Sequence, residues 1–205
     1  MRPAIFLDRD GVINENRADH VMAWEQFAPV PGALAGLRKL TALDLPIIVI
    51  TNQAVVGRGD LPEEALAALH GNMCRLIERH GGRITAVYAC PHRPEDRCAC
   101  RKPRPGLFVR AARDHDLDLA SSYFIGDALT DITAGQAAGC TTVLVRTGRG
   151  LAQMFSPHAQ PYSGFYVAQN LPHAARFIAR ELARKQGRQR RFMDLRMGFY
   201  DVQFI

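Results

Sequence analysis

Six short apolar segments alternate with longer segments in which apolar residues recur at helical spacing. The short segments are continuous runs rich in Ile, Val, Phe and Tyr, which is typical of strands buried on both faces of a parallel sheet. They cover 4–7, 46–51, 84–89, 123–126, 142–145 and 165–168. Helices are predicted over roughly 32–43, 62–80, 105–116, 129–138 and 171–185. This alternation predicts an α/β fold with a doubly wound parallel sheet.

Polar residues stand at the ends of four predicted strands. Asp8 and Asp10 follow the first strand, Thr51 ends the second, Cys90 follows the third and Asp127 follows the fourth. Chemistry in open α/β sheets takes place beyond the carboxyl ends of the strands. We therefore expect these side chains to share one site at that edge.

The chain has 205 residues, 47% of them hydrophobic, which is enough for one domain with a buried core. Its formal net charge of +6 is uneven, because 182–205 holds six Arg or Lys and only two Asp. We predict one domain over 1–185 and a basic tail over 186–205. A solvated tail is the simpler interpretation of this charge, and a polyanionic partner is the alternative.

The location of the protein is also constrained by its sequence. The longest aliphatic stretch, near 45–50, is too short to cross a bilayer, and the N-terminus shows no signal-peptide pattern. Three of the five cysteines cluster beside a His, which argues against a secreted disulfide framework. We expect a cytoplasmic protein that does not contact membranes.

The carboxylates expected at one edge of the sheet would repel each other unless a cation lay among them. Mg²⁺ prefers oxygen ligands and keeps positions open for a substrate phosphate. Thr51 and Lys102 could supply the hydrogen bonds and positive charge that phosphoryl transfer requires. An Asp can also attack phosphorus and form an aspartyl-phosphate. Asp131 either supports a metal or caps a helix.

These residues, in this order, resemble the haloacid dehalogenase (HAD) superfamily over roughly 3–150. Its four motifs match 8–12 (Asp-Arg-Asp-Gly-Val), 51–53 (Thr-Asn-Gln), Lys102, and 126–127 with Asp131. The resemblance implies that Asp8 is the nucleophile and that Asp10 is the general acid and then the base. It further implies a phosphoryl clamp and a magnesium site. The clamp is formed by Thr51 and Lys102, and the magnesium ligands are Asp8, the backbone carbonyl of Asp10, and Asp127.

A second cluster of chemically active residues lies in the segment 90–102. Cys90, His92, Cys98 and Cys100 offer three thiolates and one imidazole, a closed tetrahedral set typical of structural zinc. No helix separates the two ligand pairs, so the loop does not resemble a DNA-reading zinc finger. A metal-free cysteine cluster is the alternative.

The predicted zinc loop leads directly into Arg101 and the candidate catalytic Lys102. A guanidinium binds phosphate through two hydrogen bonds, so Arg101 is a candidate contact for a second anionic group of the substrate. A simple surface charge is the alternative. Cys74 and Cys140 fit no site and are interpreted as core residues.

The zinc loop marks a branch of the superfamily, because the chain resembles the D-glycero-D-manno-heptose 1,7-bisphosphate 7-phosphatases and the related histidinol-phosphate phosphatases. The resemblance implies that no large cap domain is present and that short loops shape the pocket. Ala128 and Ala54 depart from the Lys and Ser common in heptose enzymes, which leaves the substrate and its anomer open. The implied sugar contacts are Asn16, Arg17, Ala18, Asp19, Asn52, Gln53, Ala54 and Arg101.

The leading hypothesis is a magnesium-dependent phosphatase that removes the 7-phosphate of D-glycero-D-manno-heptose 1,7-bisphosphate through an aspartyl-phosphate. Histidinol-phosphate hydrolysis is the first alternative. Polynucleotide end processing is the second, and it is disfavoured because the basic residues cluster outside the predicted fold. We expect a monomer whose partner is a phosphorylated small molecule.

Overall fold

The computed structural model describes residues 1–155 and 163–197, with side chains as far as residue 187. Its centre is a six-stranded sheet in the order β3-β2-β1-β4-β5-β6, and every neighbouring pair is parallel. The predicted doubly wound α/β fold is confirmed. The strands are β1 (Ile5–Leu7), β2 (Ile47–Asn52), β3 (Ala86–Cys90), β4 (Tyr123–Gly126), β5 (Thr141–Val145) and β6 (Phe165–Ala168).

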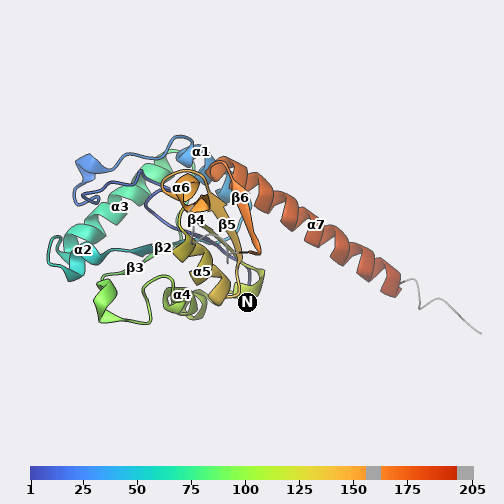
Figure 1. The fold of residues 1–205 in the computed structure, drawn as a ribbon. Coiled ribbons are helices and arrows are strands. Elements are labelled where there is room, and N and C mark those ends of the chain that lie inside the picture. The colour runs from blue at the N-terminus through green and yellow to red at the C-terminus, as the bar shows by residue number, and fades with distance from the viewer. Residues whose placement is uncertain (156–162, 198–205) are drawn as a thin grey trace, which may run out of the picture.

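Helices cover both faces of this sheet (Figure 1). One face packs against α1, α3 and α7 through residues such as Leu37, Leu69 and Ile178, and the other packs against α4 and α5 through Phe108 and Ala134. Because both faces are covered, the strands are continuously apolar. The helices are α1 (Ala33–Thr41), α2 (Ala54–Gly57), α3 (Glu63–Arg79), α4 (Gly106–His115), α5 (Leu129–Ala137), α6 (Gly150–Met154) and α7 (Leu171–Met197).

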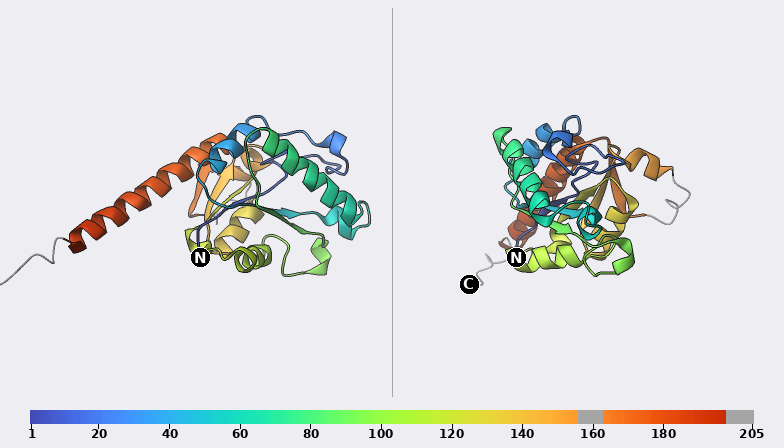
Figure 2. Two further views of the ribbon diagram at one scale, coloured as in Figure 1. Left: turned by 180° about the vertical axis from the view of Figure 1, so that it is seen from behind. Right: turned by 90° about the vertical axis from the view of Figure 1, so that its left-hand side faces the viewer.

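The last helix is longer than predicted, since α7 continues beyond residue 185 to Met197. Its first turns pack on the core through Leu171, Ala174, Ala175 and Ile178. The remainder extends away from the body of the domain (Figures 1 and 2). The end of the predicted basic tail, 198–205, lies outside the described residues.

The connections of the sheet place the loops that form the site. Between β1 and β2 the chain forms loops, a short 3-10 helix and α1, and between β2 and Lys102 it forms α2, α3, β3 and the zinc loop. Neither connection holds an inserted domain, so the expected absence of a cap domain is confirmed. The described part of the chain has no helix with the length and apolarity that a membrane span requires.

Candidate active site

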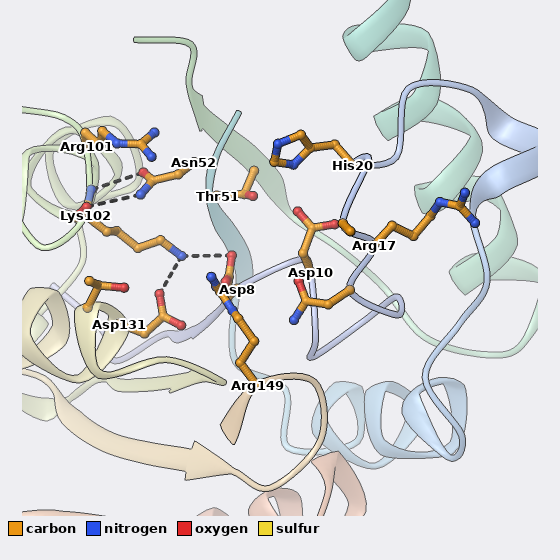
Figure 3. A pocket seen from close by; sticks show the side chains of 13 residues that line it. Asp8, Asp10, Arg17, His20, Thr51, Asn52, Arg101, Lys102, Asp131 and Arg149 are labelled. Carbon is orange, nitrogen blue, oxygen red and sulfur yellow. Dashed lines mark hydrogen bonds and ion pairs between the residues drawn. The ribbon is translucent and has the colours of Figure 1, made fainter. Parts of the chain in front are cut away.

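The carboxyl ends of the central strands bring together side chains that lie far apart in the sequence. Asp8 follows β1, Thr51 lies in β2, Lys102 follows β3 and the zinc loop, and Asp127 follows β4. They surround a cavity of about 500 Å³ (Figure 3). Its lining comprises Asp8, Asp10, Asn16, Arg17, Ala18, His20, Thr51, Asn52, Arg101, Lys102, Thr130, Asp131 and Arg149.

Lys102 is the buried cation at the base of this cavity, with a side chain only 3% exposed. Its Nζ lies 2.8 Å from Asp8 Oδ1 and 2.7 Å from Asp131 Oδ1, and it donates to the Ile50 carbonyl oxygen at 2.9 Å. Burial alone would lower the pKa of Lys102, but the two carboxylates outweigh burial and raise it. The ammonium is therefore charged and fixed beside Asp8.

The three buried carboxylates of Asp8, Asp127 and Asp131 form a group whose ligand oxygens lie within 4.8 Å of one another. Burial raises the pKa of Asp8 to about 6, although Lys102 opposes the shift. Burial, followed by the charge of Asp8, also raises the pKa of Asp127. Hard oxygen donors that repel one another in this way fit a divalent cation such as Mg²⁺. The carboxylate of Asp10 is not in the group, so a contribution of Asp10 to a metal would come from its backbone, as the resemblance implies.

Asp131 was expected either to support a metal or to cap a helix, and each of its carboxylate oxygens has a different partner. Its Oδ2 accepts hydrogen bonds from the backbone N–H groups of Asp127 and Ala128, both at 3.1 Å, and thereby caps the start of α5. Its other oxygen pairs with Lys102. Gly126 is required at this turn because a Cβ there would overlap the Asp131 side chain. Asp131 therefore both caps the helix and positions the lysine.

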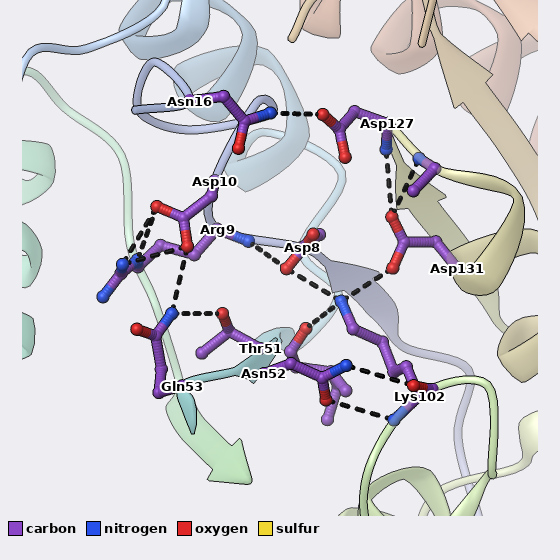
Figure 4. A network of polar contacts seen from close by, with 12 residues as sticks. Asp8, Arg9, Asp10, Asn16, Thr51, Asn52, Gln53, Lys102, Asp127 and Asp131 are labelled. Carbon is purple, nitrogen blue, oxygen red and sulfur yellow. Dashed lines mark hydrogen bonds and ion pairs between the residues drawn. The ribbon is translucent and has the colours of Figure 1, made fainter. Parts of the chain in front are cut away.

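Asp10 is held by a separate network on the other side of Asp8 (Figure 4). Arg9 Nη2 donates to both of its carboxylate oxygens at 2.9 Å, Asn14 Nδ2 donates at 2.8 Å and Gln53 Nε2 at 3.0 Å. Burial raises the pKa of Asp10, but the charge of Arg9 and these hydrogen bonds outweigh it and lower the pKa. The Arg9 side chain is itself 1% exposed and contacts His70 Nε2 at 3.1 Å through Nη1. The role of Arg9, Asn14 and His70 in holding Asp10 was not predicted from the sequence.

His70 gives this network a measurable pH dependence. Burial, followed by the charge of Arg9, lowers the pKa of His70 to about 4, whereas an unfolded His titrates near 6.5. Between these values the unfolded chain binds more protons, so the free energy of unfolding falls as the pH falls from 6.5 towards 4, by about 3 kcal/mol in all. His70→Gln keeps an acceptor for Arg9 without titrating, and should remove this part of the slope. Urea unfolding between pH 7 and 4.5 measures it.

A control for this prediction is His80→Gln, at the exposed C-terminal end of the same helix. The pH dependence of the control should follow that of the wild type. Equal slopes for the wild type and His70→Gln would contradict the assignment of a neutral, buried His70.

The predicted substrate contacts divide into two groups. Five of them line the cavity: Asn16, Arg17, Ala18, Asn52 and Arg101. The other three do not: Asp19, Gln53 and Ala54. Arg17 forms two hydrogen bonds with Asp19, at 2.9 and 2.7 Å, whereas Gln53 joins Thr51 Oγ1 to Asp10.

Asn52 has a positioning contact as well as a place in the cavity wall. Its side chain exchanges two hydrogen bonds of 3.1 Å with the backbone N–H and C=O of Lys102. These bonds join the end of β2 to the segment that follows the zinc loop. His20, Thr130 and Arg149 also line the cavity and were not identified from the sequence.

The predicted zinc ligands Cys90, His92, Cys98 and Cys100 converge on one point. The three Sγ–Sγ distances are 3.3, 3.3 and 3.6 Å, and His92 Nδ1 lies 3.2 Å from Cys100 Sγ. Zn–S bonds of about 2.3 Å in a tetrahedron place sulfurs about 3.8 Å apart, so the cluster is compatible with zinc. Four protein ligands complete such a shell, and the site is therefore structural in type.

Comparison with known proteins agrees with this geometry. A family model described as HAD-hydrolase-like matches residues 99–174. The chain is 41% identical over 146 residues to a D-glycero-beta-D-manno-heptose-1,7-bisphosphate 7-phosphatase of Bordetella bronchiseptica, covering 71% of this chain and 82% of that protein. It is 34% identical over 193 residues to a D-glycero-D-manno-heptose-1,7-bisphosphate 7-phosphatase of Thermosynechococcus vestitus, covering 89% and 98%.

A solved structure shows the same fold. The crystal structure of D,D-heptose 1,7-bisphosphate phosphatase from B. bronchiseptica, complexed with magnesium and phosphate, superposes with a TM-score of 0.81 at 37% identity. The match covers 88% of this chain and 99% of that one. The chain therefore belongs to the HAD-like hydrolases, as a HAD-type phosphatase related to the D-glycero-manno-heptose-1,7-bisphosphate 7-phosphatases.

Proposed function

We propose that this phosphatase hydrolyses the 7-phosphate of D-glycero-D-manno-heptose 1,7-bisphosphate, with Asp8 as nucleophile. The observation that carries the proposal is a cavity that places a guanidinium, Arg101, in the same wall as Asp8 and Lys102. A bisphosphate needs one group of residues for the phosphoryl group that reacts and another cation for the phosphate that does not. The names of the relatives support the same substrate.

The first step transfers the phosphoryl group to the protein. An Asp8 oxygen attacks phosphorus, the bond from phosphorus to the sugar oxygen breaks, and Asp10 gives its proton to that oxygen. Lys102 and Thr51 stabilise charge on the phosphoryl oxygens. A magnesium ion held by Asp8, Asp127 and the Asp10 backbone carbonyl, with Asp131 nearby, would supply further positive charge there.

The second step returns the free carboxylate of Asp8. A water molecule attacks phosphorus, Asp10 takes a proton from that water, the bond between phosphorus and the Asp8 oxygen breaks, and inorganic phosphate leaves. The lowered pKa of Asp10 keeps its carboxylate ionised before the water attacks, which a base requires. The negative charge of a bound phosphoryl group raises the same pKa and so favours the acid role in the first step. Gln53 bonds both Thr51 and Asp10, and thereby fixes the acid–base group relative to the phosphoryl clamp.

The test is magnesium-dependent phosphate release from heptose 1,7-bisphosphate, histidinol phosphate and a 3′-phosphorylated oligonucleotide. We expect a strong preference for the bisphosphate. A preference for histidinol phosphate would assign the protein to that reaction with the same catalytic residues. A preference for the oligonucleotide, weakening steeply with salt, would indicate binding to a phosphate backbone.

We also propose that the protein acts as a monomer in the cytoplasm. A reducing compartment would keep the clustered thiols of Cys90, Cys98 and Cys100 available as ligands. Gel filtration with light scattering measures the oligomeric state, and a stable dimer would contradict this expectation.

Deletion of 187–205 should leave turnover within about twofold of the wild-type value, which corresponds to less than about 0.5 kcal/mol of barrier. The cavity is built from residues between Asp8 and Arg149. The α7 side chains described as packing on the core, from Leu171 to Leu182, all precede the deletion. Steady-state kinetics of the truncated protein checks this. Loss of activity in a truncation that circular dichroism shows to be folded would assign a role to the tail.

A further inference from the structure

Arg149 is a cavity residue to which the proposed mechanism gives no role. It precedes α6 on the loop after β5, and its backbone N–H donates to Asp127 Oδ2 at 2.8 Å. Its guanidinium Nη2 lies 3.5 Å from Asp127 Oδ1. Figure 3 shows the side chain reaching into the cavity towards Asp8, from the side opposite Arg101. The Arg149 carbonyl also accepts a hydrogen bond from Gln153 N–H at 2.9 Å, so the backbone is held through both its N–H and its C=O. Among the described residues, the side chain has only the 3.5 Å contact with Asp127.

The other cations of the cavity differ from Arg149 in what they contact. Lys102 is buried between two carboxylates at 2.8 and 2.7 Å, and Arg17 forms two short hydrogen bonds with Asp19. The Arg149 side chain is 58% exposed. Its one ion-pair partner in the described part of the chain, Asp127, belongs to the carboxylate group that fits Mg²⁺. A divalent cation bound to that group would neutralise Asp127 and repel the guanidinium.

The long contact with Asp127 and the repulsion by a bound cation together favour a guanidinium that turns away from Asp127 and into the cavity. An Arg side chain stays charged under all ordinary conditions, and its planar fork matches two phosphate oxygens. Lys102 already serves the reacting phosphoryl group at the base of the cavity, where it is 3% exposed. The Arg149 side chain is far more exposed than that of Lys102. The unreactive part of a substrate must lie at this exposed end of the cavity.

We propose that Arg149 determines specificity by binding the phosphate that is not hydrolysed, after metal binding has released its side chain from Asp127. The inference rests on the proposed function, because it needs a substrate with two phosphates. It assigns Arg149 and Arg101, on opposite sides of the cavity, to the same anionic group. It also makes metal and guanidinium competitors for Asp127 in the absence of substrate.

The first experiment measures Mg²⁺ binding without substrate, by isothermal titration calorimetry of the full-length protein. Arg149→Met should bind Mg²⁺ about fivefold more tightly than the wild type, since a competing positive charge has been removed. Arg149→Lys should fall between the two. The matched control is Arg58→Met, which removes an Arg that pairs with Asp60 at 2.7 Å outside the cavity and should not change Mg²⁺ affinity. Equal affinity in the wild type and Arg149→Met would overturn the competition for Asp127.

The second experiment compares heptose 1,7-bisphosphate with the same sugar carrying only the 7-phosphate. Arg149→Met should raise KM for the bisphosphate about 10- to 100-fold and leave kcat/KM for the monophosphate nearly unchanged, with partial rescue in Arg149→Lys. Equal losses on both substrates, in a variant whose parent prefers the bisphosphate, would overturn the role of Arg149 and leave the proposed function standing. A wild type without that preference would overturn both.

Discussion

Asp8→Asn is expected to reduce phosphate release by at least about 10³-fold, because an amide cannot attack phosphorus. The variant should remain folded. Burial raises the pKa of Asp8 to about 6, which shows that the surroundings disfavour its charge. Lys102 keeps Asp131 as a second partner at 2.7 Å when the Asp8 carboxylate is lost. We therefore expect thermal stability equal to or above that of the wild type, a common property of substitutions at catalytic residues.

The measurement is magnesium-dependent phosphate release, together with trapping of the aspartyl-phosphate by rapid quenching and mass spectrometry. The wild type should show a covalent phosphate on Asp8, and Asp8→Asn should show none. Asp116→Asn is a suitable control, because Asp116 is exposed and has a positive φ of 51° that Asn also tolerates. Retained turnover in Asp8→Asn would remove Asp8 from the role of nucleophile.

The sheet could be predicted from the sequence because its strands are buried on both faces. That burial produces continuous apolar runs, such as 46–51, which forms β2 (Ile47–Asn52). The one-turn helices α2 and α6 could not be predicted, since they depend on tertiary contacts such as the hydrogen bond from Leu129 N–H to Gln153 Oε1. The extension of α7 was missed because its charge resembled a tail, although Arg, Gln, Leu and Met all favour helix.

The site shows the same division between local and long-range information. The order of the strands brings Asp8, Thr51 and Asp127 to one edge, and each follows or ends a recognisable apolar run. The contact between Arg9 and His70 joins residues 61 positions apart, and it depends on how α3 packs against the first loop. No spacing rule indicates such a pair. The contact of Arg149 with Asp127 could not be predicted either, because it also joins residues that are distant in the sequence.

Cys98→Ser is expected to release zinc and to lower both stability and activity. Structural zinc contributes on the order of 10 kcal/mol to a small metal-binding fold, and a loss of even 3 kcal/mol lowers Tm by about 10 °C in a domain of this size. Apart from zinc, the loop is held to neighbouring segments through backbone carbonyls. Those of Cys90, Pro91 and Ala99 accept from the backbone N–H groups of Gln53, Gly57 and Gly106 at 2.7, 2.9 and 3.2 Å, and that of Cys98 accepts from Arg104 Nη1 at 2.6 Å. Metal analysis by mass spectrometry and thermal unfolding measure the two losses.

The effect of this substitution on catalysis should depend on the substrate. Lys102 is also held by Asn52, Asp8 and Asp131, so it should remain near its position when the loop loosens. Among the residues that the structure describes, the Arg101 side chain has one hydrogen-bond partner, the His92 carbonyl at 3.2 Å, and His92 is itself a predicted zinc ligand. Loss of zinc should therefore reduce kcat/KM for the bisphosphate by about tenfold or more, and it should reduce kcat/KM for the 7-phosphate alone by less.

The control is Cys74→Ser, which lies away from the loop and should keep its zinc. Normal metal content in Cys98→Ser would overturn the zinc assignment, and equal losses on both substrates would show that the loop acts through Lys102 instead of Arg101.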